Sequence, residues 1–382
     1  IYYFCAMRFL TADYLFPLHT NPIKEGVLQI SDDGRVITIF KNRREVNQDK
    51  LEVFKGILCP GFVNAHCHLE LSHLKGRAEK GQGFLEFSKT IRLRDNYSVA
   101  AKKQAIEKAE QEMITNGIVG VGDICNKVDT LEKKQKENLK YYNFIETFGV
   151  DLNKVDTVFN QAIALRNEFR VTGQKASIVP HAPYSVPPVL MKKINNSFDD
   201  SDELLTIHMQ ETNEENQLFE YKKGAFFDWL NSMNACLSIW GSRNKSTDIL
   251  QELSGKKVLL VHNTFAKKED MTDNYYCTCP RANLYIENNL PDYSIFDSDK
   301  LCVGTDSLAS NNSLSILDEI IVIQNNSNFD LNTLLKIASK NGAKALGFDQ
   351  LGTFEKGKFP GVNLIKNLDG WKFTADCFIQ VI

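Results

Sequence analysis

Short aliphatic runs in this chain repeatedly end at a histidine or an aspartate. Runs of this length, bounded by polar or turn-forming residues, predict β-strands. The residues that follow five such runs are His66 with His68, His181, His208, His262 and Asp306. Side chains that can bind a metal therefore stand where strands are expected to end, and the fold must be one in which several strand ends meet.

The runs and the segments between them predict an α/β fold. Eight candidate strands lie at 57–64, 118–124, 139–148, 176–180, 204–207, 257–261, 275–279 and 301–304. Helical patterns separate most of them, at 98–116, 154–169, 188–195, 218–233 and 245–253, and a final helix is expected at 331–346. This alternation favours a (β/α)8 TIM-type barrel. A doubly wound open sheet is the alternative, but it would gather its site at one switch point, whereas here the polar residues follow strands 1, 4, 5, 6 and 8.

Both ends of the chain have the pattern of an antiparallel β unit. Residues 27–40 hold two β-rich runs around Asp-Asp-Gly-Arg, which predicts a hairpin. Residues 351–365 again alternate turns and strand-like runs. We therefore expect residues 1–56 and 347–382 to form one small β-sandwich domain and residues 57–346 to form the barrel.

Composition excludes several classes of protein. The 382 residues carry a net charge of −3 with charges of both signs interspersed, so there is no basic surface for nucleic acid or for an anionic membrane. The sequence has no apolar run of 18 or more residues, so no membrane span is predicted. Residues 1–18 contain Arg8 and Asp13 and lack a cleavage site of small residues, so we expect strand there and not a signal peptide. The nine cysteines form no paired motif, which predicts reduced thiols and a cytoplasmic location.

His66 and His68 stand two residues apart at the end of the first run. On a strand such residues share one face, and two imidazoles at one dry strand end indicate a metal site and chemistry on water. A simple hydrogen-bonded pair is the alternative for this pattern taken alone. The recurrence of donors after later strands favours the metal site, and we expect His19 and His73 to be ordinary surface or loop residues.

Taken together, these segments resemble the amidohydrolase superfamily, in its deaminase and chlorohydrolase branch. The resemblance spans most of the chain and rests on Pro-Gly-Phe-Val-Asn-Ala-His66-Cys-His68, Pro180-His181-Ala-Pro-Tyr184-Ser, Ile-His208-Met-Gln-Glu211-Thr, Val-His262-Asn, Cys279-Pro-Arg-Ala-Asn283-Leu-Tyr and Gly304-Thr-Asp306-Ser-Leu-Ala-Ser. It implies one divalent ion held by His66, His68, His208 and Asp306. Zn²⁺ suits three imidazoles and one carboxylate, and Fe²⁺ is the alternative. Two-metal relatives carry a bridging carboxylated lysine on a middle strand, and no lysine follows the strand at 176–180, so we expect a single ion.

The resemblance also implies catalytic roles for three residues. Glu211 would carry a proton from the attacking water to a ring nitrogen of an aromatic substrate. The alternative for Glu211 is a solvated acid, which is what we expect for Glu214 and Glu215. His262 would hydrogen-bond the water or the developing oxyanion, and Asp306, besides holding the metal, would pass a proton to the departing amine.

Five further residues are expected to contact a substrate: His181, Glu70, Arg92, Asn283 and Ser307. His181 resembles the substrate-contacting histidine of the purine-type deaminases, with anchoring of the next turn as the alternative. Arg92 and Arg94 lie in a segment expected to cover the barrel mouth, where an arginine would meet a ribosyl hydroxyl or a carboxylate unless it forms a surface ion pair. Glu70 follows the histidine pair and would orient a ligand or the substrate.

The predicted function is hydrolytic deamination of an amino-substituted heterocycle, either an adenine-type nucleoside such as aminofutalosine or a guanine-type base. Hydrolysis of a ring amide or of a halogenated ring by the same metal chemistry is the rival within enzymes. A non-catalytic structural relative is a remote rival, because the full donor set is present. The polynucleotide deaminases combine His-X-Glu with Pro-Cys-X-X-Cys, and this combination is absent. The expected partner is a small molecule, and the resemblance leaves a homodimer open.

Overall fold

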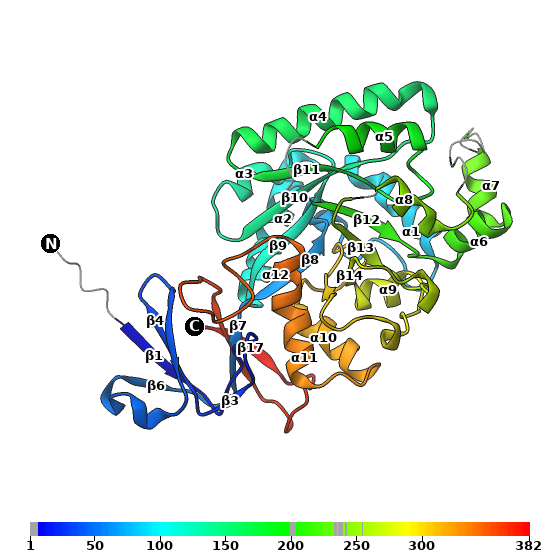
Figure 1. Cartoon of the computed structure of the whole chain (residues 1–382). Helices are drawn as coiled ribbons and strands as arrows, with labels where there is room; N and C mark the ends of the chain where they lie inside the picture. The colour runs from blue at the N-terminus through cyan, green and yellow to red at the C-terminus, as the bar shows by residue number, and fades with distance from the viewer. Residues whose placement is uncertain (1–6, 199–203, 233–234, 236–239, 241–242, 254) are drawn as a thin grey trace.

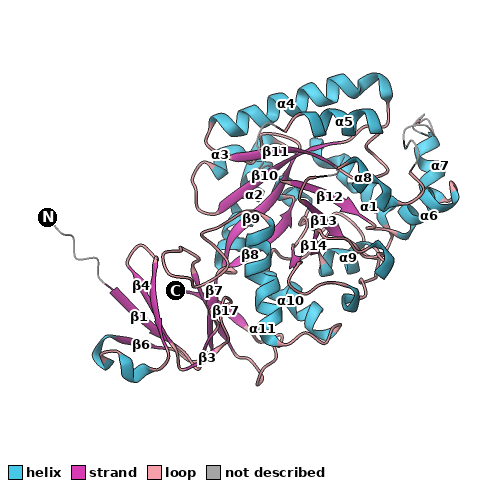
Figure 2. Ribbon diagram, viewed as in Figure 1, coloured by secondary structure: helices cyan, strands magenta, loops and turns pink. Residues whose placement is uncertain are grey.

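The computed structural model describes residues 7–198, 204–232, 235, 240, 243–253 and 255–382. The chain forms a mixed α/β body, with strands at its centre and helices around them, and a smaller β part that contains both ends of the described chain (Figures 1 and 2). The predicted α/β class is therefore confirmed, and β structure occurs at both ends as expected.

The small β part consists of two sheets. One has the order β5-β4-β1-β6, with β1 Met7–Thr11, β4 Val27–Ser31, β5 Val36–Phe40 and β6 Leu51–Val53. The other has the order β17-β16-β7-β2-β3, with β2 Tyr14–Leu15, β3 Ile23–Lys24, β7 Ile57–Pro60, β16 Val362–Lys366 and β17 Phe378–Val381. The antiparallel β4–β5 pair is the hairpin predicted at 27–40. Residues 7–11 and 14–15 are strands, as expected of the first segment, and residues 1–6 lie outside the described chain.

Side chains of both small sheets share one hydrophobic cluster. Leu10, Leu28 and Ile30 come from the first sheet, and Leu58 and Leu364 from the second, and all five are buried. Because β16 pairs antiparallel with β7, the C-terminal segment returns to the N-terminal strands, as its pattern predicted. This pairing brings the C-terminal strand β16 next to β7, which directly precedes the first strand of the α/β body in the sequence.

The α/β body contains two parallel four-stranded sheets. The first has the order β11-β10-β9-β8, with β8 Phe62–Cys67, β9 Ile118–Cys125, β10 Lys140–Thr147 and β11 Lys175–Pro180. The second has the order β12-β13-β14-β15, with β12 Leu205–Met209, β13 Val258–His262, β14 Tyr275–Thr278 and β15 Leu301–Val303. These are the eight predicted strands, and their bounds differ from the expected ones by a few residues at most, apart from the first.

Contacts join the two parallel sheets at both pairs of edge strands. Beyond β8 and β15, Cys67 and Asp306 form a parallel bridge, and the amides of Thr305 and Asp306 both donate to the carbonyl of His66 at 3.1 Å. Beyond β11 and β12, the amide of His208 donates to the carbonyl of His181 at 2.9 Å. The carboxyl ends of strands from both sheets therefore lie close to one another.

Helices connect the strands of the α/β body. They are α1 Phe84–Ile91, α2 Val99–Thr115, α3 Leu131–Lys134, α4 Val155–Val171, α5 Pro188–Asn196, α6 Asn213–Tyr221, α7 Ala225–Ser232, α8 Ile249–Glu252, α9 Pro280–Ile286, α10 Ile316–Asn325, α11 Leu331–Leu335 and α12 Asn341–Ala345. The predicted helices at 98–116, 154–169 and 188–195 correspond to α2, α4 and α5, and the one at 245–253 contains α8. The one predicted at 331–346 is interrupted by a π-helical turn at Lys336–Lys340 between α11 and α12.

Two sequence predictions about the elements are wrong. The strand expected at 57–64 is two strands, because Gly61 separates β7 of the small sheet from β8; a Cβ on Gly61 would lie 2.4 Å from a methyl group of Val119. The helix expected at 218–233 is divided between α6 and α7, because Lys222 and Gly224 adopt φ values of 52° and 99°. Position 233 lies outside the described residues. Both breaks occur where a left-handed residue or a close backbone approach overrides the apolar periodicity.

Two further findings concern the chain as a whole. Within the described ranges, no helix has the length and apolar character needed to cross a lipid bilayer. The seven cysteines in the described part of the chain are all unpaired thiols, as expected, while Cys5 and Cys236 lie outside it.

Substitutions at two glycines that follow helices test the contact between the small β part and the α/β body. Gly117 follows α2 with φ 72°, its carbonyl accepts a hydrogen bond of 2.9 Å from Asn363 Nδ2, and a Cβ there would lie 2.4 Å from that amide group. Gly173 follows α4 with φ 82°, and no described atom lies within 4 Å of its Cβ position. We expect Gly173→Ala to lower the free energy of unfolding by about 1 kcal/mol and Gly117→Ala by about 2–4 kcal/mol, since only the second adds a clash to the backbone strain. Urea unfolding of both variants measures this, and equal losses would contradict it.

Candidate active site

A cavity of about 490 Å³ opens at the carboxyl ends of the parallel strands. Its volume lies within the usual range for small-molecule sites. One end is lined by ionisable side chains, namely His68, His208, His262, Glu211 and Asp306. Much of the remaining lining is aromatic or aliphatic and includes Phe84, Phe87, Ile91, Phe148, Tyr184 and Trp229. The segment 84–94, predicted to cover the mouth of the site, does line it through α1 and the turn that follows.

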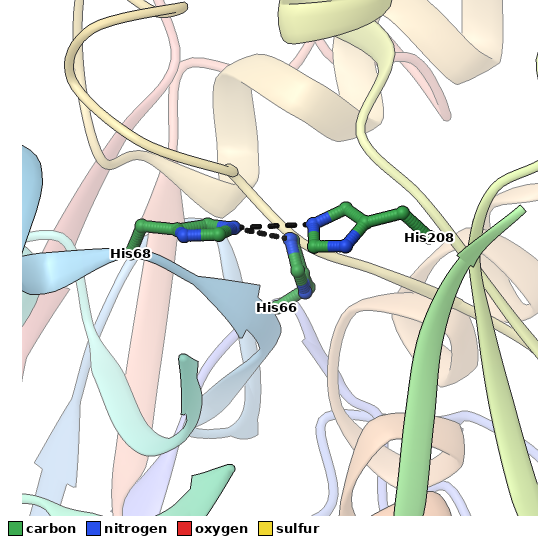
Figure 3. A group of neighbouring side chains, drawn as sticks. All are labelled: His66, His68 and His208. Atoms are coloured by element: carbon green, nitrogen blue, oxygen red, sulfur yellow. Dashed lines mark hydrogen bonds between the residues drawn. The ribbon is translucent and has the colours of Figure 1, made fainter. Parts of the chain in front are cut away.

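Three imidazoles converge at the polar end of the cavity. Figure 3 shows His66, His68 and His208 with their ring nitrogens directed at a common point. His68 Nε2 lies 3.1 Å from His66 Nε2 and 3.2 Å from His208 Nε2. Asp306 Oδ1 lies 3.5 Å from His68 Nε2 and 3.7 Å from His66 Nε2. Side chains from distant parts of the sequence therefore present four donor atoms to one point.

The spacing of these atoms fits a small cation better than hydrogen bonds. Zn²⁺ binds nitrogen and oxygen donors at about 2.0–2.1 Å in a tetrahedral arrangement, so two ligand atoms stand about 3.3 Å apart. His68 Nε2 has room for one proton at most, which cannot serve both neighbouring nitrogens. The donor atoms of His66, His68 and His208 lie within 4.8 Å of one another, as do those of His66, His262 and Asp306.

The backbone around the histidine pair differs from the one expected. His66 lies on β8, but His68 lies just beyond the strand, with φ −119° and ψ 75°, at the start of the short 3-10 helix η3 Leu69–Leu74. The strand therefore ends between the two histidines, and the chain turns directly after His68. Gly304 makes room for this segment, since a Cβ there would lie 2.7 Å from the carbonyl oxygen of His66.

Hydrogen bonds fix the orientation of two of the donors. His208 Nδ1 donates to the carbonyl of His181 at 2.9 Å, and because a carbonyl only accepts, Nε2 is left with its lone pair facing the cluster. Asp306 accepts a hydrogen bond from Ser310 Oγ on Oδ2, which leaves Oδ1 facing His66 and His68. These are the arrangements that metal-binding histidines and carboxylates need from their surroundings.

Burial sets the charge state of the cluster. It lowers the pKa of His66 and of His68 to about 3, so both imidazoles are neutral near pH 7. Burial by itself would raise the pKa of Asp306, but the imidazoles of His66, His68 and His262 around it hold that pKa well below its usual value. Neutral imidazoles and an ionised carboxylate are the forms that bind a divalent cation, so this donor set fits Zn²⁺ or Fe²⁺.

The side chains of Glu211 and His262 lie next to the four donors. Glu211 Oε1 lies 3.6 Å from His262 Nε2, and both side chains are buried and line the cavity. Burial raises the pKa of Glu211 to about 8, so the carboxyl group can hold a proton at neutral pH. His262 Nδ1 donates to Asn283 Oδ1 at 2.8 Å, which leaves Nε2 directed toward Glu211. A carboxyl group tuned in this way is suited to moving a proton.

Three residues near the cluster adopt left-handed backbone conformations. Gln210, His262 and Asp306 have φ values of 48°, 71° and 54°. Each follows or ends a parallel strand, so these positions turn the chain sharply at the cavity. Left-handed non-glycine residues are costly and tend to occur at functional sites, which agrees with the position of the cluster.

A polar strip of Arg94, Asn126 and Glu146 also lines the cavity, and of these residues only Arg94 was expected there. Arg94 donates to Asn126 Oδ1 at 2.9 Å, and Asn126 Nδ2 donates to Glu146 Oε2 at 3.1 Å. Glu146 Oε1 is buried and receives no hydrogen bond from the described residues. Glu146 lies at the end of β10, so the strand-end pattern that marked the histidines could have identified it.

Of the five residues expected to contact a substrate, three line the cavity as the structure describes it and two do not. His181, Arg92 and Ser307 line the cavity, and the guanidinium of Arg92 lies 5.9 Å from the centre of the Trp229 ring. Glu70 is buried outside the described lining, where it accepts hydrogen bonds from the amides of residues 126 and 127 and lies 3.7 Å from Arg94. Glu70 thus supports the polar strip and does not face the cavity.

Two further expectations need correction. Asn283 also lies outside the described lining and instead orients His262. Glu215 was expected to be a solvated acid, but it is fully buried and accepts a hydrogen bond of 3.1 Å from the amide of Gln210. It therefore stabilises the turn that leads to Glu211. His19 and His73 lie outside the donor cluster, as expected.

Comparison with known proteins agrees with this geometry. The model of the amidohydrolase family matches residues 57–376. The aminodeoxyfutalosine deaminase of a Nitratiruptor species is 25% identical over 343 residues, which cover 85% of this chain and 83% of that protein. The adenosine deaminase of Helicobacter pylori is 27% identical over 317 residues, covering 79% and 77%.

Solved structures show the same fold. The Helicobacter pylori aminofutalosine deaminase in complex with methylthio-coformycin superposes with a TM-score of 0.81 at 24% identity, over 96% of this chain and 93% of that one. The guanine deaminase of C. acetobutylicum superposes with a TM-score of 0.70 at 16% identity, over 94% and 91%. Since the family model covers most of the sequence, including every residue of the donor cluster, this chain belongs to the amidohydrolase family.

Proposed function

We propose that this chain is a metal-dependent hydrolase that deaminates an adenine-type nucleoside or a related aminopurine. The observation that carries the proposal is the convergence of three imidazoles and one carboxylate beside a buried glutamic acid with a raised pKa, at one end of a cavity of about 490 Å³. A guanine-type base is the second substrate class that the same chemistry would accept.

The fold that supports this site is proposed to be a closed (β/α)8 barrel. The contacts between residues 66 and 306 and between residues 181 and 208 support closure of the two parallel sheets into one ring. The two small sheets, which share a core, are proposed to be a β-sandwich domain made from residues 1–56 and 347–382, with residues 57–346 as the catalytic barrel. The pairing of β7 with β16 would add residues 57–60 to the sandwich.

His66, His68, His208 and Asp306 are proposed to hold one divalent ion, Zn²⁺ or Fe²⁺. When bound there, the ion would lower the pKa of a water molecule so that it becomes a nucleophile at neutral pH. The neutral state of the buried imidazoles and the orientation of His208 by the carbonyl of His181 support this assignment.

Proton transfer is assigned to Glu211, with His262 and Asp306 assisting. Glu211 takes a proton from the attacking water and delivers it to a ring nitrogen, which makes the adjacent ring carbon electrophilic. Water adds to that carbon, the amino group takes up a proton and leaves as ammonia, and the ring retains the oxygen. His262, oriented by Asn283, hydrogen-bonds the oxygen that adds, and Asp306 relays the proton to the leaving amine.

The cavity wall supports a nucleoside as the substrate. Arg94 offers a donor on one wall, and Glu146 offers an acceptor without a hydrogen bond from the described residues, a combination that suits hydroxyl groups, which both donate and accept. The aromatic residues of the cavity lining suit the flat ring and an apolar substituent. The relatives named above are deaminases of adenosine-type compounds, which favours the same class here. A cytoplasmic location and a homodimer stay predictions.

A substrate panel tests the reaction. We expect the Zn²⁺-loaded protein to release ammonia from adenosine, 5′-deoxyadenosine or aminofutalosine with a kcat/KM at least about tenfold above that for free adenine, since the free base lacks the hydroxyls that the polar wall would bind. Ammonia is measured by a coupled assay, and guanine and a chlorinated triazine are included. Chloride release from the triazine without ammonia release from any purine would contradict the proposal.

Glu211→Gln tests the proton carrier. The amide keeps the size of the side chain but cannot move a proton, so kcat should fall by about 10²–10⁴, while the Zn²⁺ content stays near that of the wild type. Glu214→Gln is the matched control, because it makes the same change in the next turn of the chain outside the described cavity lining, and it should leave kcat nearly unchanged. Elemental analysis and ammonia release give the two readouts, and near-normal turnover of the Glu211→Gln variant would exclude the role.

Asp306→Ala tests the metal site. Removing one of four donors should reduce both the Zn²⁺ content of the purified protein and its activity, since three imidazoles alone bind the ion less tightly. Asp299→Ala is the control, because that side chain is 73% exposed and its ion pair with Lys336, at 3.8 Å, is long. One Zn²⁺ per chain in the Asp306→Ala variant after extensive dialysis would refute the assignment of Asp306.

A further inference from the structure

The ladder between β8 and β9 is interrupted beside the histidine pair. The register of the two strands shifts between Asn64 and Cys67, so that Cys67 stands opposite Asp123. Gly122 permits this irregularity, because a Cβ there would lie 2.5 Å from the carbonyl oxygen of Ala65. Because the regular hydrogen bonds between β8 and β9 are interrupted here, the backbone groups beyond residue 67 need other hydrogen-bond partners.

Asp123 supplies such a partner through its side chain. Its Oδ1 accepts a hydrogen bond of 2.8 Å from the backbone amide of Leu69, the residue that follows His68. The ψ angle of His68, 75°, determines where that amide points, so holding the amide restricts the rotation of the chain at His68. The position of a donor imidazole thus depends on the carboxylate of another strand.

Lys134 holds the other oxygen of this carboxylate. Its side chain is fully buried, and Nζ donates to Asp123 Oδ2, to Asn143 Oδ1 at 2.7 Å and to Cys125 Sγ at 3.2 Å. The three protons of the ammonium group therefore all have acceptors. With one oxygen fixed by Lys134, the other is directed at the amide of Leu69.

The energetics of the pair argue for a positioning role. A fully buried ion pair gains little over a well-packed apolar pair, because both charges lose their hydration. The described lining of the cavity includes neither Asp123 nor Lys134, so no direct contact with a substrate accounts for them. What the pair does contribute is a fixed acceptor for the backbone at the metal-binding turn.

We propose that Asp123 and Lys134 form a positioning pair that fixes the turn after His68 and thereby aims the His68 imidazole at the metal. The inference rests on the proposed metal site and extends it to two residues that do not bind the ion. Positioning partners of this kind change metal affinity by about 10- to 100-fold when they are removed.

Two double variants separate the backbone contact from the ion pair. The amide double variant combines Asp123→Asn with Lys134→Met, which removes both charges but keeps a side-chain oxygen for the amide of Leu69. The leucine double variant combines Asp123→Leu with Lys134→Met, which removes both charges and the acceptor. Neither variant leaves an uncompensated buried charge, which is the change that would most endanger folding.

Lys133→Met combined with Glu110→Gln is the matched control, because Glu110 is fully buried and would keep an uncompensated charge if the lysine alone were changed. Lys133 is the neighbour of Lys134 on α3 and also forms a buried ion pair, with Glu110 at 2.8 Å, but among the described residues no hydrogen bond joins it to Leu69. This control reports what breaking a buried ion pair on this helix does to the fold alone.

The measurements are the Zn²⁺ dissociation constant from competition with a chromophoric chelator, the visible spectrum of the Co²⁺-substituted protein, and the melting temperature of the metal-free protein. We expect the leucine double variant to bind Zn²⁺ at least about tenfold more weakly than the amide double variant and to show an altered Co²⁺ spectrum. The control and the amide double variant should stay within about threefold of the wild type, well inside the effect expected for a lost positioning partner. The metal-free melting temperatures of the two double variants should be similar.

The outcomes distinguish this inference from the proposed function. Equal Zn²⁺ affinity of the two double variants, with tight binding by the wild type, would overturn the positioning role alone. A wild-type protein that bound no Zn²⁺ would overturn the metal site and this inference together. A loss of affinity in the control that combines Lys133→Met with Glu110→Gln, if as large as in the leucine double variant, would also overturn the positioning role, because it would trace the loss to general damage of the fold.

Discussion

The site depends on the contact between the end of β8 and the segment that follows β15. Two backbone amides, of Thr305 and Asp306, donate to the carbonyl of His66, and Asn64 forms two side-chain hydrogen bonds with Thr305. Gly304 lets the two segments approach this closely. Because of this contact, the carboxylate of Asp306, which follows the last parallel strand in the sequence, lies beside the imidazoles of His66 and His68, which lie at the end of the first.

The same close packing gives opposite properties to neighbouring groups. Burial keeps His66 and His68 neutral, with pKa values of about 3, and raises the pKa of Glu211 to about 8. Loss of hydration disfavours the charged form in each case, which is the cation of an imidazole and the anion of a carboxyl group. One dry environment therefore provides both lone pairs for a cation and a group that holds a proton beside them.

The polar strip lies beside the donor cluster in the same cavity. The donor atoms and Glu211 stand at the strand ends, and the polar strip of Arg94, Asn126 and Glu146 also lines the cavity. Glu70 supports this strip from behind, through Arg94 and the amides of residues 126 and 127. Glu146 Oε1 lies 3.5 Å from His208 Nδ1, so the polar strip and the donor cluster are in contact.

The sequence by itself determined the α/β class, most bounds of the parallel strands and the polar residues that follow them, because these are local features of the chain. The choice of four donors among those residues came from the family resemblance. Tertiary structure alone decided which polar side chains face the cavity. Glu70 turns to Arg94, Asn283 turns to His262, and Glu146 accepts from Asn126 through one oxygen only, each through a partner far along the chain. The direction of a side chain beyond a strand end follows from the turn that its distant neighbours impose, as Asp123 does at His68, and no periodicity of the sequence encodes such a turn.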